Sequence, residues 1–290
     1  MSLPVLVTTD FSALSESAYP FAARFARAHG LSVRLVHVSD IDVFHGAADR
    51  GHPWERDLLL YIEERLADSA NRLRALGVEV ETRVRIGIAS KELLAESREG
   101  VSLAVLATRG HGGLLRAILG SVAAKFVQHA TVPVLAVPQG ATDAVPERVL
   151  FPIDFSELTN GVLGRAIELL APFAANVELF HAHPPIGAAA SVVHVSGKAE
   201  AIVEASFGER LSEYATHCNA AGLNATWQLS DAHSPAGAIL ERADVLDTQL
   251  IVMAGHGRRG LERLLLGSVA EAVVRRAHQP VLVLKAPDGE

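Results

Sequence analysis

The feature that most constrains this sequence is an internal duplication. The segment VLVTTDFS, which contains Asp10, returns as VLFPIDFS, which contains Asp154, 144 residues later (154 − 10). A glycine-rich segment that begins at Gly110 returns at Gly257, 147 residues later (257 − 110). Solenoid repeats have much shorter periods and more copies, so two copies of this length indicate a duplicated domain.

The two predicted domains are residues 1–140 and 146–290. Both copies end alike, in VPVLAV at 132–137 and QPVLVL at 279–284. The segment PQGATDAVPE at 138–147 is rich in proline, glycine and small polar residues, which is typical of a linker. The length of 290 residues also suits two domains of ordinary size.

Each half alternates short β-branched runs with longer amphipathic stretches. We expect strands at 4–9, 32–38, 78–84, 102–107 and 133–137, and again at 148–153, 176–182, 224–229, 249–254 and 281–285. Helices are expected at 13–29, 56–76, 89–98 and 121–130, and at 157–174, 198–221, 235–244 and 268–277. This alternation predicts two tandem doubly wound α/β domains, each with a parallel sheet and helices on both faces.

Residues typical of helix ends and loops agree with this assignment of helices and strands. Ser12 and Ser15 are predicted N-caps of the first helix, and Gly30 and Gly77 lie where helices should end. Residues 40–55 and 184–197 lack periodicity and are interpreted as loops.

Composition limits the partners. The formal net charge of -7 and pI near 6.0 argue against a general binder of nucleic acid or of acidic membranes. The single cysteine, Cys218, excludes an intrachain disulfide and a cysteine-ligated metal site. Neither a targeting segment nor a membrane-length apolar run is evident. We therefore predict a cytoplasmic protein with no nucleic-acid or membrane partner.

Three polar features in each half should meet beyond the carboxyl ends of the strands, where a doubly wound sheet binds ligands. They are the aspartate that closes the first strand, the glycine after the fourth strand and the Gly-Ser pair that opens the last helix (Asp10, Gly110, Gly120 and Ser121; Asp154, Gly257, Gly267 and Ser268). A glycine at a helix start lets phosphate oxygens approach the backbone N–H groups, and the helix dipole favours their charge. An aspartate can accept hydrogen bonds from a ribose or an adenine amine.

With this spacing the chain resembles the universal stress proteins, whose α/β domain carries a first-strand Asp and the signature G-x-x-G-(nine residues)-G-(S/T). Nine residues separate Gly110 from Gly120, and nine separate Gly257 from Gly267. The resemblance covers nearly the whole chain, twice. One departure is that alanine (Ala107 or Ala254) replaces the first glycine of the signature, which adds a methyl group near the expected ribose.

The resemblance implies a five-stranded parallel sheet in the order 3-2-1-4-5 and an ATP-type ligand, with any Mg²⁺ carried by the nucleotide. By position, Asp10 and Asp154 would face the ribose and base, beside Ala107 and Ala254, and the segments around Val38 and Ala182 would line the adenine. The phosphates would be held by Gly110, Gly120 and Ser121, and by Gly257, Gly267 and Ser268. Pairing through the fifth strand is usual in the family, so the two halves are expected to mimic a dimer within the chain, and a homodimer is also open.

Three functions stay open. We prefer an ATP-binding stress protein with a regulatory or protective role, because the phosphate loops come without an evident catalytic base or metal cage. A partner-binding module with empty sites is the second, and Ala107 and Ala254 motivate it. A slow adenine-nucleotide hydrolase is the third. If only one half binds nucleotide, the second half is expected to, since its signature is closer to that of the family.

Other patterns are given less weight. The run GHGRRG at 255–260 spells G-x-G-x-x-G but follows the fourth strand rather than the first, and no P-loop motif is present. Basic residues gather in both glycine loops, and at least one phosphate contact is expected among them (Arg109, His111 and Arg116; His256, Arg258, Arg259 and Arg263). His181 and His183 would face the same way on a strand, but no third ligand is evident, so no metal site is predicted.

Overall fold

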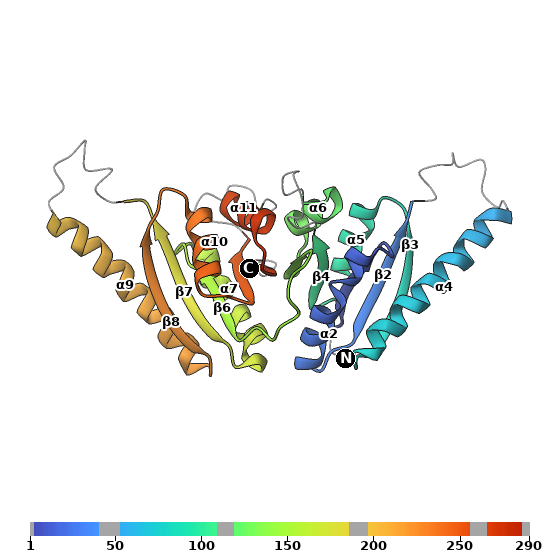
Figure 1. Ribbon diagram of the computed structural model, residues 1–290, viewed down its shortest axis with the longest axis horizontal. Helices are drawn as coiled ribbons and strands as arrows, with labels where there is room; N and C mark the ends of the chain where they lie inside the picture. The colour runs from blue at the N-terminus through green and yellow to red at the C-terminus, as the bar shows by residue number, and fades with distance from the viewer. Residues whose placement is uncertain (1–2, 41–52, 109–118, 186–196, 256–265, 286–290) are drawn as a thin grey trace. The chain divides into compact units, whose positions relative to one another are not determined.

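The structure is a computed structural model that describes residues 3–40, 53–108, 119–185, 197–255 and 266–285. The chain divides into two compact units, Met1–Asp143 and Ala144–Glu290. Each unit is a parallel β-sheet with helices packed on it (Figure 1).

The first unit contains strands in the order β3-β2-β1-β4-β5. The strands are β1 (Val5–Thr9), β2 (Val33–Ser39), β3 (Val80–Ile86), β4 (Leu103–Thr108) and β5 (Val134–Pro138). The helices are α1 (Ala13–Glu16), α2 (Tyr19–Ala28), α4 (Pro53–Ala75), α5 (Ala89–Arg98) and α6 (Ser121–His129). All the strand pairs described in this unit are parallel.

The second unit repeats this plan, with strands in the order β8-β7-β6-β9-β10. The strands are β6 (Arg148–Pro152), β7 (Asn176–His183), β8 (Asn224–Asp231), β9 (Leu250–Ala254) and β10 (Val281–Leu284). The helical segments are α7 (Glu157–Leu170), the short η1 (Ala171–Phe173), α9 (Gly197–Ala220), α10 (Pro235–Val245) and α11 (Ser268–Arg276). The order 3-2-1-4-5 is therefore confirmed in both units.

Helices cover both faces of each sheet, as the alternation predicts. In the first unit α2 and α4 pack together against β1 and β2, while α5 packs with α6 and contacts the same strands from the opposite face. In the second unit α9 packs on β7 and β8, and α10 packs with α11. Parallel strands joined by helices need this arrangement, because each crossover must pass over a face of the sheet.

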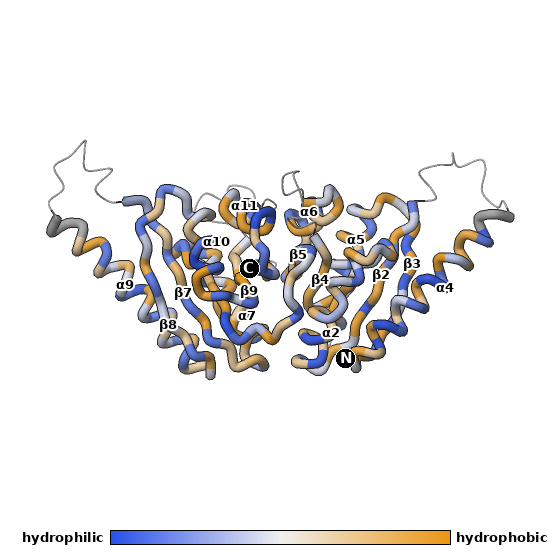
Figure 2. Tube along the Cα trace, viewed as in Figure 1, coloured by the Kyte–Doolittle hydropathy of each residue, from blue (hydrophilic) through white to orange (hydrophobic). Residues whose placement is uncertain are grey.

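Burial follows strand position. The central strand β1 begins with three fully buried apolar residues, Val5, Leu6 and Val7, each at 0% exposure. The outer strand β3 is half-exposed and charged, which makes it a poor template for pairing with another chain. Figure 2 shows hydrophilic and hydrophobic residues alternating along α4, as expected for a helix with one face on the sheet. No helix in the described residues combines the length and apolarity that crossing a membrane requires.

Three local predictions were wrong. The helix expected at 13–29 is broken between α1 and α2, because Pro20 lies in the first turn of α2 and has no N–H to continue the hydrogen-bond ladder. Ser15 lies inside α1, whereas Ser12 is the N-cap and accepts a hydrogen bond from the Ser15 N–H. The predicted loop 40–55 overlaps a helix, since α4 begins at Pro53, whereas α9 begins at Gly197, within one residue of the predicted helix 198–221. The glycines expected at helix ends, Gly30 and Gly77, have φ of +63° and +81°.

A charge pair joins strand two to the helix before strand four in both units, with its signs exchanged; it is buried in the first unit and half-buried in the second. In the first unit Arg34 on β2 faces Glu96 on α5. The second unit places Glu178 on β7 against Arg242 on α10, 144 and 146 residues later (178 − 34 and 242 − 96). The duplicated scaffold therefore keeps the ion pair while the residue types are exchanged.

Candidate functional site

The aspartate after the first strand has the same local structure in both units. The Asp10 carboxylate accepts hydrogen bonds from the Ser12 backbone N–H at 3.0 Å and from the Ser12 hydroxyl at 2.5 Å. Asp154 accepts from the Ser156 N–H at 3.0 Å and from the Thr159 hydroxyl at 2.6 Å. Each aspartate is thus held by the cap of the following helix, at the carboxyl end of the strand where the site is predicted.

These contacts change the acidity of Asp10. Partial burial acts to raise the pKa of the Asp10 carboxyl, but the hydrogen bonds from the Ser12 hydroxyl and N–H stabilise the charged form more strongly. The pKa of Asp10 therefore lies below its ordinary value. The group is a carboxylate at neutral pH, suited to accept hydrogen bonds from hydroxyl or amine donors.

A strained phenylalanine follows each aspartate. Phe11 and Phe155 have φ of +63° and +57°, in the left-handed region that bulky residues avoid. Strain of this kind persists where the surroundings enforce it, and it is concentrated at functional sites. Its presence at the same position in both units marks this turn as a shared feature of the duplicated scaffold.

Histidines from the second strand support these turns. The His37 Nδ1 lies 2.9 Å from the Thr9 carbonyl oxygen, and the His181 Nδ1 lies 2.6 Å from that of Ile153. The ring centroids of Phe11 and His37 are 4.2 Å apart, and those of Phe155 and His181 are 4.6 Å apart. Each histidine therefore contacts the backbone at the end of the first strand of its unit and the phenylalanine that follows it.

An arginine from the long helix covers each phenylalanine. The Arg65 guanidinium on α4 lies 5.5 Å from the Phe11 ring centroid, and that of Arg210 on α9 lies 4.1 Å from the Phe155 ring. Both distances fit cation–π contacts. The sequence analysis missed these arginines, although their common offset of 145 residues (210 − 65) is a signal in the repeat.

The predicted residues on the neighbouring strands reach the same edge of each sheet. Val38 lies near the end of β2 and Ala182 near the end of β7, each half-buried. Ala107 is the penultimate residue of β4 and Ala254 the last residue of β9, and both are also half-buried. Each sheet therefore has two of these positions, at the carboxyl ends of the two strands that pair with the aspartate's strand.

Glycine caps the last helix of each unit. Gly120 and Gly267 are the N-caps of α6 and α11, with φ of -55° and -62°, and no side chain caps either helix. Ser121 and Ser268 follow as the first helical residues. A glycine cap has no side chain of its own that could accept a hydrogen bond from the first N–H groups of the helix.

The start of α11 is tied to the strand beside it. The Gly267 N–H donates to the Gly255 carbonyl oxygen at 2.7 Å, and the Gly255 N–H donates to that of Leu284 at 2.8 Å. These bonds fix the helix start against β9 and β10. The predicted phosphate glycines Gly110 and Gly257 lie outside the described residues, as do the basic residues predicted beside them (Arg109, His111, Arg116, His256, Arg258, Arg259 and Arg263).

The second unit also contains a pocket of about 590 Å³ that lies away from the predicted ligand position. Its lining comes from β7, β8 and α10, and includes Phe180, Ser230 and Glu241. The predicted ligand position is between β6 and β9, where the adjoining glycine loop is outside the described residues. The strand ends and helix caps recur in both units, whereas this pocket is described in the second unit.

One group of side chains was missed by the sequence analysis. His183 at the end of β7 lies near Glu204 on α9 and Asp231 at the end of β8, with one potential ligand atom from each within 4.8 Å of the others. Among the described residues it is the group of histidine and acidic side chains that could hold a metal ion. Aligning the two halves of the sequence gives one signal for this group, because the first half has other residue types at the three positions that match His183, Glu204 and Asp231.

Comparison with known proteins gives one consistent result. The sequence model of the universal stress protein family matches residues 1–138 and 146–285. A universal stress protein of Mycolicibacterium smegmatis is 28% identical over 301 residues, covering 97% of this chain and 96% of that protein. The crystal structure of a universal stress protein from Archaeoglobus fulgidus DSM 4304 covers 98% of both chains, with 22% sequence identity and a TM-score of 0.73. A universal stress protein from Archaeoglobus fulgidus in complex with dAMP matches 49% of this chain and 100% of its own, with 24% identity and a TM-score of 0.37.

Proposed function

This chain belongs to the universal stress protein family, and on that premise we propose that it binds ATP and uses nucleotide occupancy for a regulatory or protective role in the stress response. The nucleotide would lie across the first and fourth strands of a unit, with its Mg²⁺ carried on the phosphates. The proposal places the protein in the cytoplasm and includes self-association as a property that the nucleotide could alter.

The observation that carries the proposal is the repeated pairing of an anchored carboxylate with a glycine-capped helix. Asp10 and Asp154 end the first strand of each sheet, and Gly120 and Gly267 begin the helix that follows the fourth strand. The first and fourth strands are neighbours where the strand order reverses, which is the ligand-binding position of such sheets. A carboxylate suits the ribose or base, and the helix start suits the phosphates.

Gly120 keeps room for a ligand. A Cβ atom there would meet no other atom of the described residues within 4 Å, so space remains beside the start of α6. The backbone at Gly120 and Gly267 is in a region open to every residue type. A larger residue there would therefore occupy ligand space without straining the fold.

The two units differ in the charge at the helix start. The first turn of α6 contains no acidic residue, whereas that of α11 contains Glu271, whose carboxylate lies 3.6 Å from Arg275. A negative charge at this position opposes phosphate binding. This charge argument favours nucleotide binding by the first unit, whereas the closer match to the family signature favours the second. Variants that alter one site at a time measure the difference in affinity between the two units.

The test begins with the protein as purified. Mass spectrometry of material released on denaturation should detect an adenine nucleotide, and calorimetric titration should show ATP binding to the emptied protein. Gly120→Trp and Gly267→Trp should each weaken binding at the altered unit at least tenfold, about 1.4 kcal/mol. Gly161→Trp is the matched control, because Gly161 is exposed and its Cβ would also meet no atom within 4 Å.

Three other outcomes would contradict the proposal or favour a different function. Equal ATP binding by the wild-type protein and the double variant contradicts the proposed site. Absence of bound nucleotide and of any response to ATP favours a partner-binding module instead. Appreciable release of phosphate from Mg-ATP that Asp154→Ala abolishes would make the protein a hydrolase rather than a binding protein.

A further inference from the structure

We propose that the second unit contains a site for a divalent transition-metal ion, built by His183, Glu204 and Asp231. In the proposed arrangement the His183 imidazole and the Glu204 carboxylate bind the ion, and Asp231 holds the imidazole in place and adds a second negative charge. This proposal does not rest on nucleotide binding.

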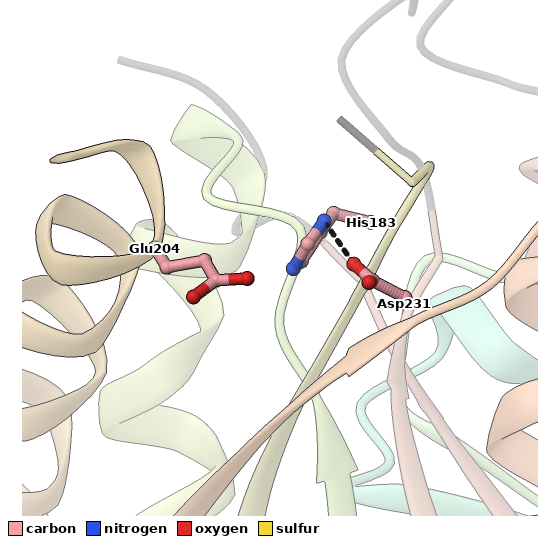
Figure 3. A group of neighbouring side chains, drawn as sticks. All are labelled: His183, Glu204 and Asp231. Atoms are coloured by element: carbon pink, nitrogen blue, oxygen red, sulfur yellow. Dashed lines mark ion pairs between the residues drawn. The ribbon is translucent and has the colours of Figure 1, made fainter. Parts of the chain in front are cut away.

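The three side chains come from three elements of one unit. His183 ends β7, Asp231 ends the adjacent strand β8, and Glu204 projects from α9, which packs on both strands. Figure 3 shows the His183 ring between the two carboxylates, with one ring nitrogen on the side of each. The register of the sheet pairs His183 with Asp231, so the parallel pairing itself brings these two residues together.

Contacts on one side fix the ring of His183. Its Nδ1 lies 3.1 Å from an Asp231 carboxylate oxygen and 3.1 Å from the Pro184 carbonyl oxygen. A carbonyl oxygen can only accept, so in the neutral ring Nδ1 carries the proton and Nε2 keeps its lone pair. Figure 3 places this second nitrogen on the side of Glu204. A carboxylate that receives the N–H of a metal-binding histidine is the usual support of such ligands.

Packing adds to this support. His183 is buried, at 5% exposure, and its ring centroid lies 5.4 Å from that of Phe207 on α9. The carboxylates of Glu204 and Asp231 remain exposed. The nitrogen ligand is therefore held in place, while the Glu204 carboxylate stays open to an ion arriving from water.

Charge also favours a cation. Within the described part of the chain, neither Glu204 nor Asp231 forms an ion pair with a lysine or arginine. With a neutral imidazole the group carries two negative charges, and a divalent ion offsets them.

The distances need only a small adjustment. Two ligands bound at about 2.1 Å to one ion are at most about 4.2 Å apart. One potential ligand atom from each of the three residues lies within 4.8 Å of the others. Rotation of the exposed Glu204 side chain can close such a gap, because a glutamate on a helix surface has several rotamers open to it.

The first unit lacks this group. The matching positions are Ser39 (183 − 144), Leu59 (204 − 145) and Ile86 (231 − 145). The same alignment pairs Arg65 with Arg210, which make equivalent contacts, so the correspondence on the long helices is sound. The shared scaffold does not require polar residues at these three positions, and the second unit alone carries a histidine and two acids there.

The ligand chemistry selects the class of ion. An imidazole nitrogen favours Zn²⁺ and its first-row neighbours, whereas Mg²⁺ and Ca²⁺ prefer oxygen ligands alone. Histidine nitrogen and glutamate oxygen are both among the ligand atoms that bind Zn²⁺ in proteins. The remaining positions around the ion would be filled by water.

The experiment measures Zn²⁺ binding by the full chain after removal of any purification tag. Equilibrium dialysis with metal analysis compares the wild-type protein with Glu204→Gln, His183→Gln and Asp231→Asn, and with Glu209→Gln as the matched control on the same helix. Glu204 and Glu209 are both exposed, so both changes leave the fold intact, and thermal melts of all variants verify this. A parallel titration with Mg²⁺ tests the class of ion.

We expect one Zn²⁺ per chain whose affinity falls at least tenfold in His183→Gln and Glu204→Gln. The loss in Asp231→Asn should be about 10- to 100-fold, the range for a residue that supports a ligand. Glu209→Gln should bind as the wild-type protein does, and Co²⁺ in place of Zn²⁺ should give visible absorption that depends on His183. The chain has 13 histidines, so Zn²⁺ could also bind elsewhere. Binding that persists unchanged in both Glu204→Gln and His183→Gln would therefore overturn the proposal. Absence of Zn²⁺ binding by the wild-type protein, or a preference for Mg²⁺, would overturn it as well.

Discussion

Replacing Glu96 with glutamine should destabilise the first unit strongly. The Glu96 side chain is 0% exposed, and its carboxylate lies 3.5 Å from Arg34 and 3.2 Å from Arg83. Arg85 donates to the same carboxylate from Nε at 2.7 Å. Because the Arg34 side chain is only 8% exposed, loss of the carboxylate leaves a guanidinium that water hardly reaches.

The size of the effect follows from the contacts that remain. Removing one partner of a buried ion pair costs about 3–5 kcal/mol. Arg34 would still donate to Glu81 and to the Glu99 carbonyl oxygen, so we expect the lower end, about 3 kcal/mol.

The second unit supplies the matched comparison. Arg242 donates to both carboxylate oxygens of Glu178, at 2.7 and 2.6 Å, but its side chain is 29% exposed. After Glu178→Gln the arginine can turn toward water, so the expected loss is about 1–2 kcal/mol.

Hydrogen exchange in increasing urea should be followed separately in the two units, because they need not unfold in one transition. Glu96→Gln should lower protection in β2, β3 and α5 while leaving the second unit unchanged. The reasoning is refuted if Glu96→Gln stays within about 0.5 kcal/mol of the wild-type protein, the range of ordinary surface changes, or if Glu178→Gln costs more.

Further predictions concern three side chains, those of Ser12, Asp10 and Cys218. Ser12→Ala removes the N-cap of α1 and should lower the free energy of unfolding by about 1 kcal/mol in thermal denaturation; an unchanged value would contradict the cap. The same change removes a donor to Asp10, so carboxyl NMR titration should show the pKa of Asp10 rising. Because the folded-state pKa of Asp10 lies below its unfolded value, its stabilising contribution exists above the unfolded value and is lost as the pH falls through the folded one. The wild-type advantage over Ser12→Ala should therefore shrink in acid, and an advantage that grows in acid would refute the assignment. Burial raises the pKa of Cys218 to about 11, so the native protein should resist a thiol reagent at pH 8 and react only on unfolding, and prompt native labelling would contradict its burial.

Much of the fold was predictable because strand and helix patterns are local. Buried parallel strands read as β-branched runs, and every predicted strand lies within a few residues of an observed one. The break between α1 and α2 was also predictable from Pro20, since proline cannot donate to the preceding turn. In the second unit Gly164 occupies the matching position (164 − 20 = 144), and α7 runs unbroken from Glu157 to Leu170.

Parts of the site depend on long-range packing and could not be read from one stretch of sequence. The approach of Glu204 to His183 requires α9 to lie across β7, and the partner of Arg34 is fixed only when α5 packs on the sheet. Comparing the two halves position by position gives a signal for both. The exchange of Arg34 and Glu96 for Glu178 and Arg242, and the replacement of Ser39 by His183, are visible in the aligned repeat.

The most direct test of the account is a crystal structure of the protein grown with Mg-ATP. The account predicts nucleotide density at the carboxyl ends of β1 and β4, of β6 and β9, or of both pairs. The phosphates should lie at the N–H groups that begin α6 or α11, and the ribose should lie beside Asp10 or Asp154. Side chains of the protein itself filling both positions, with nucleotide absent at saturating concentration, would contradict it.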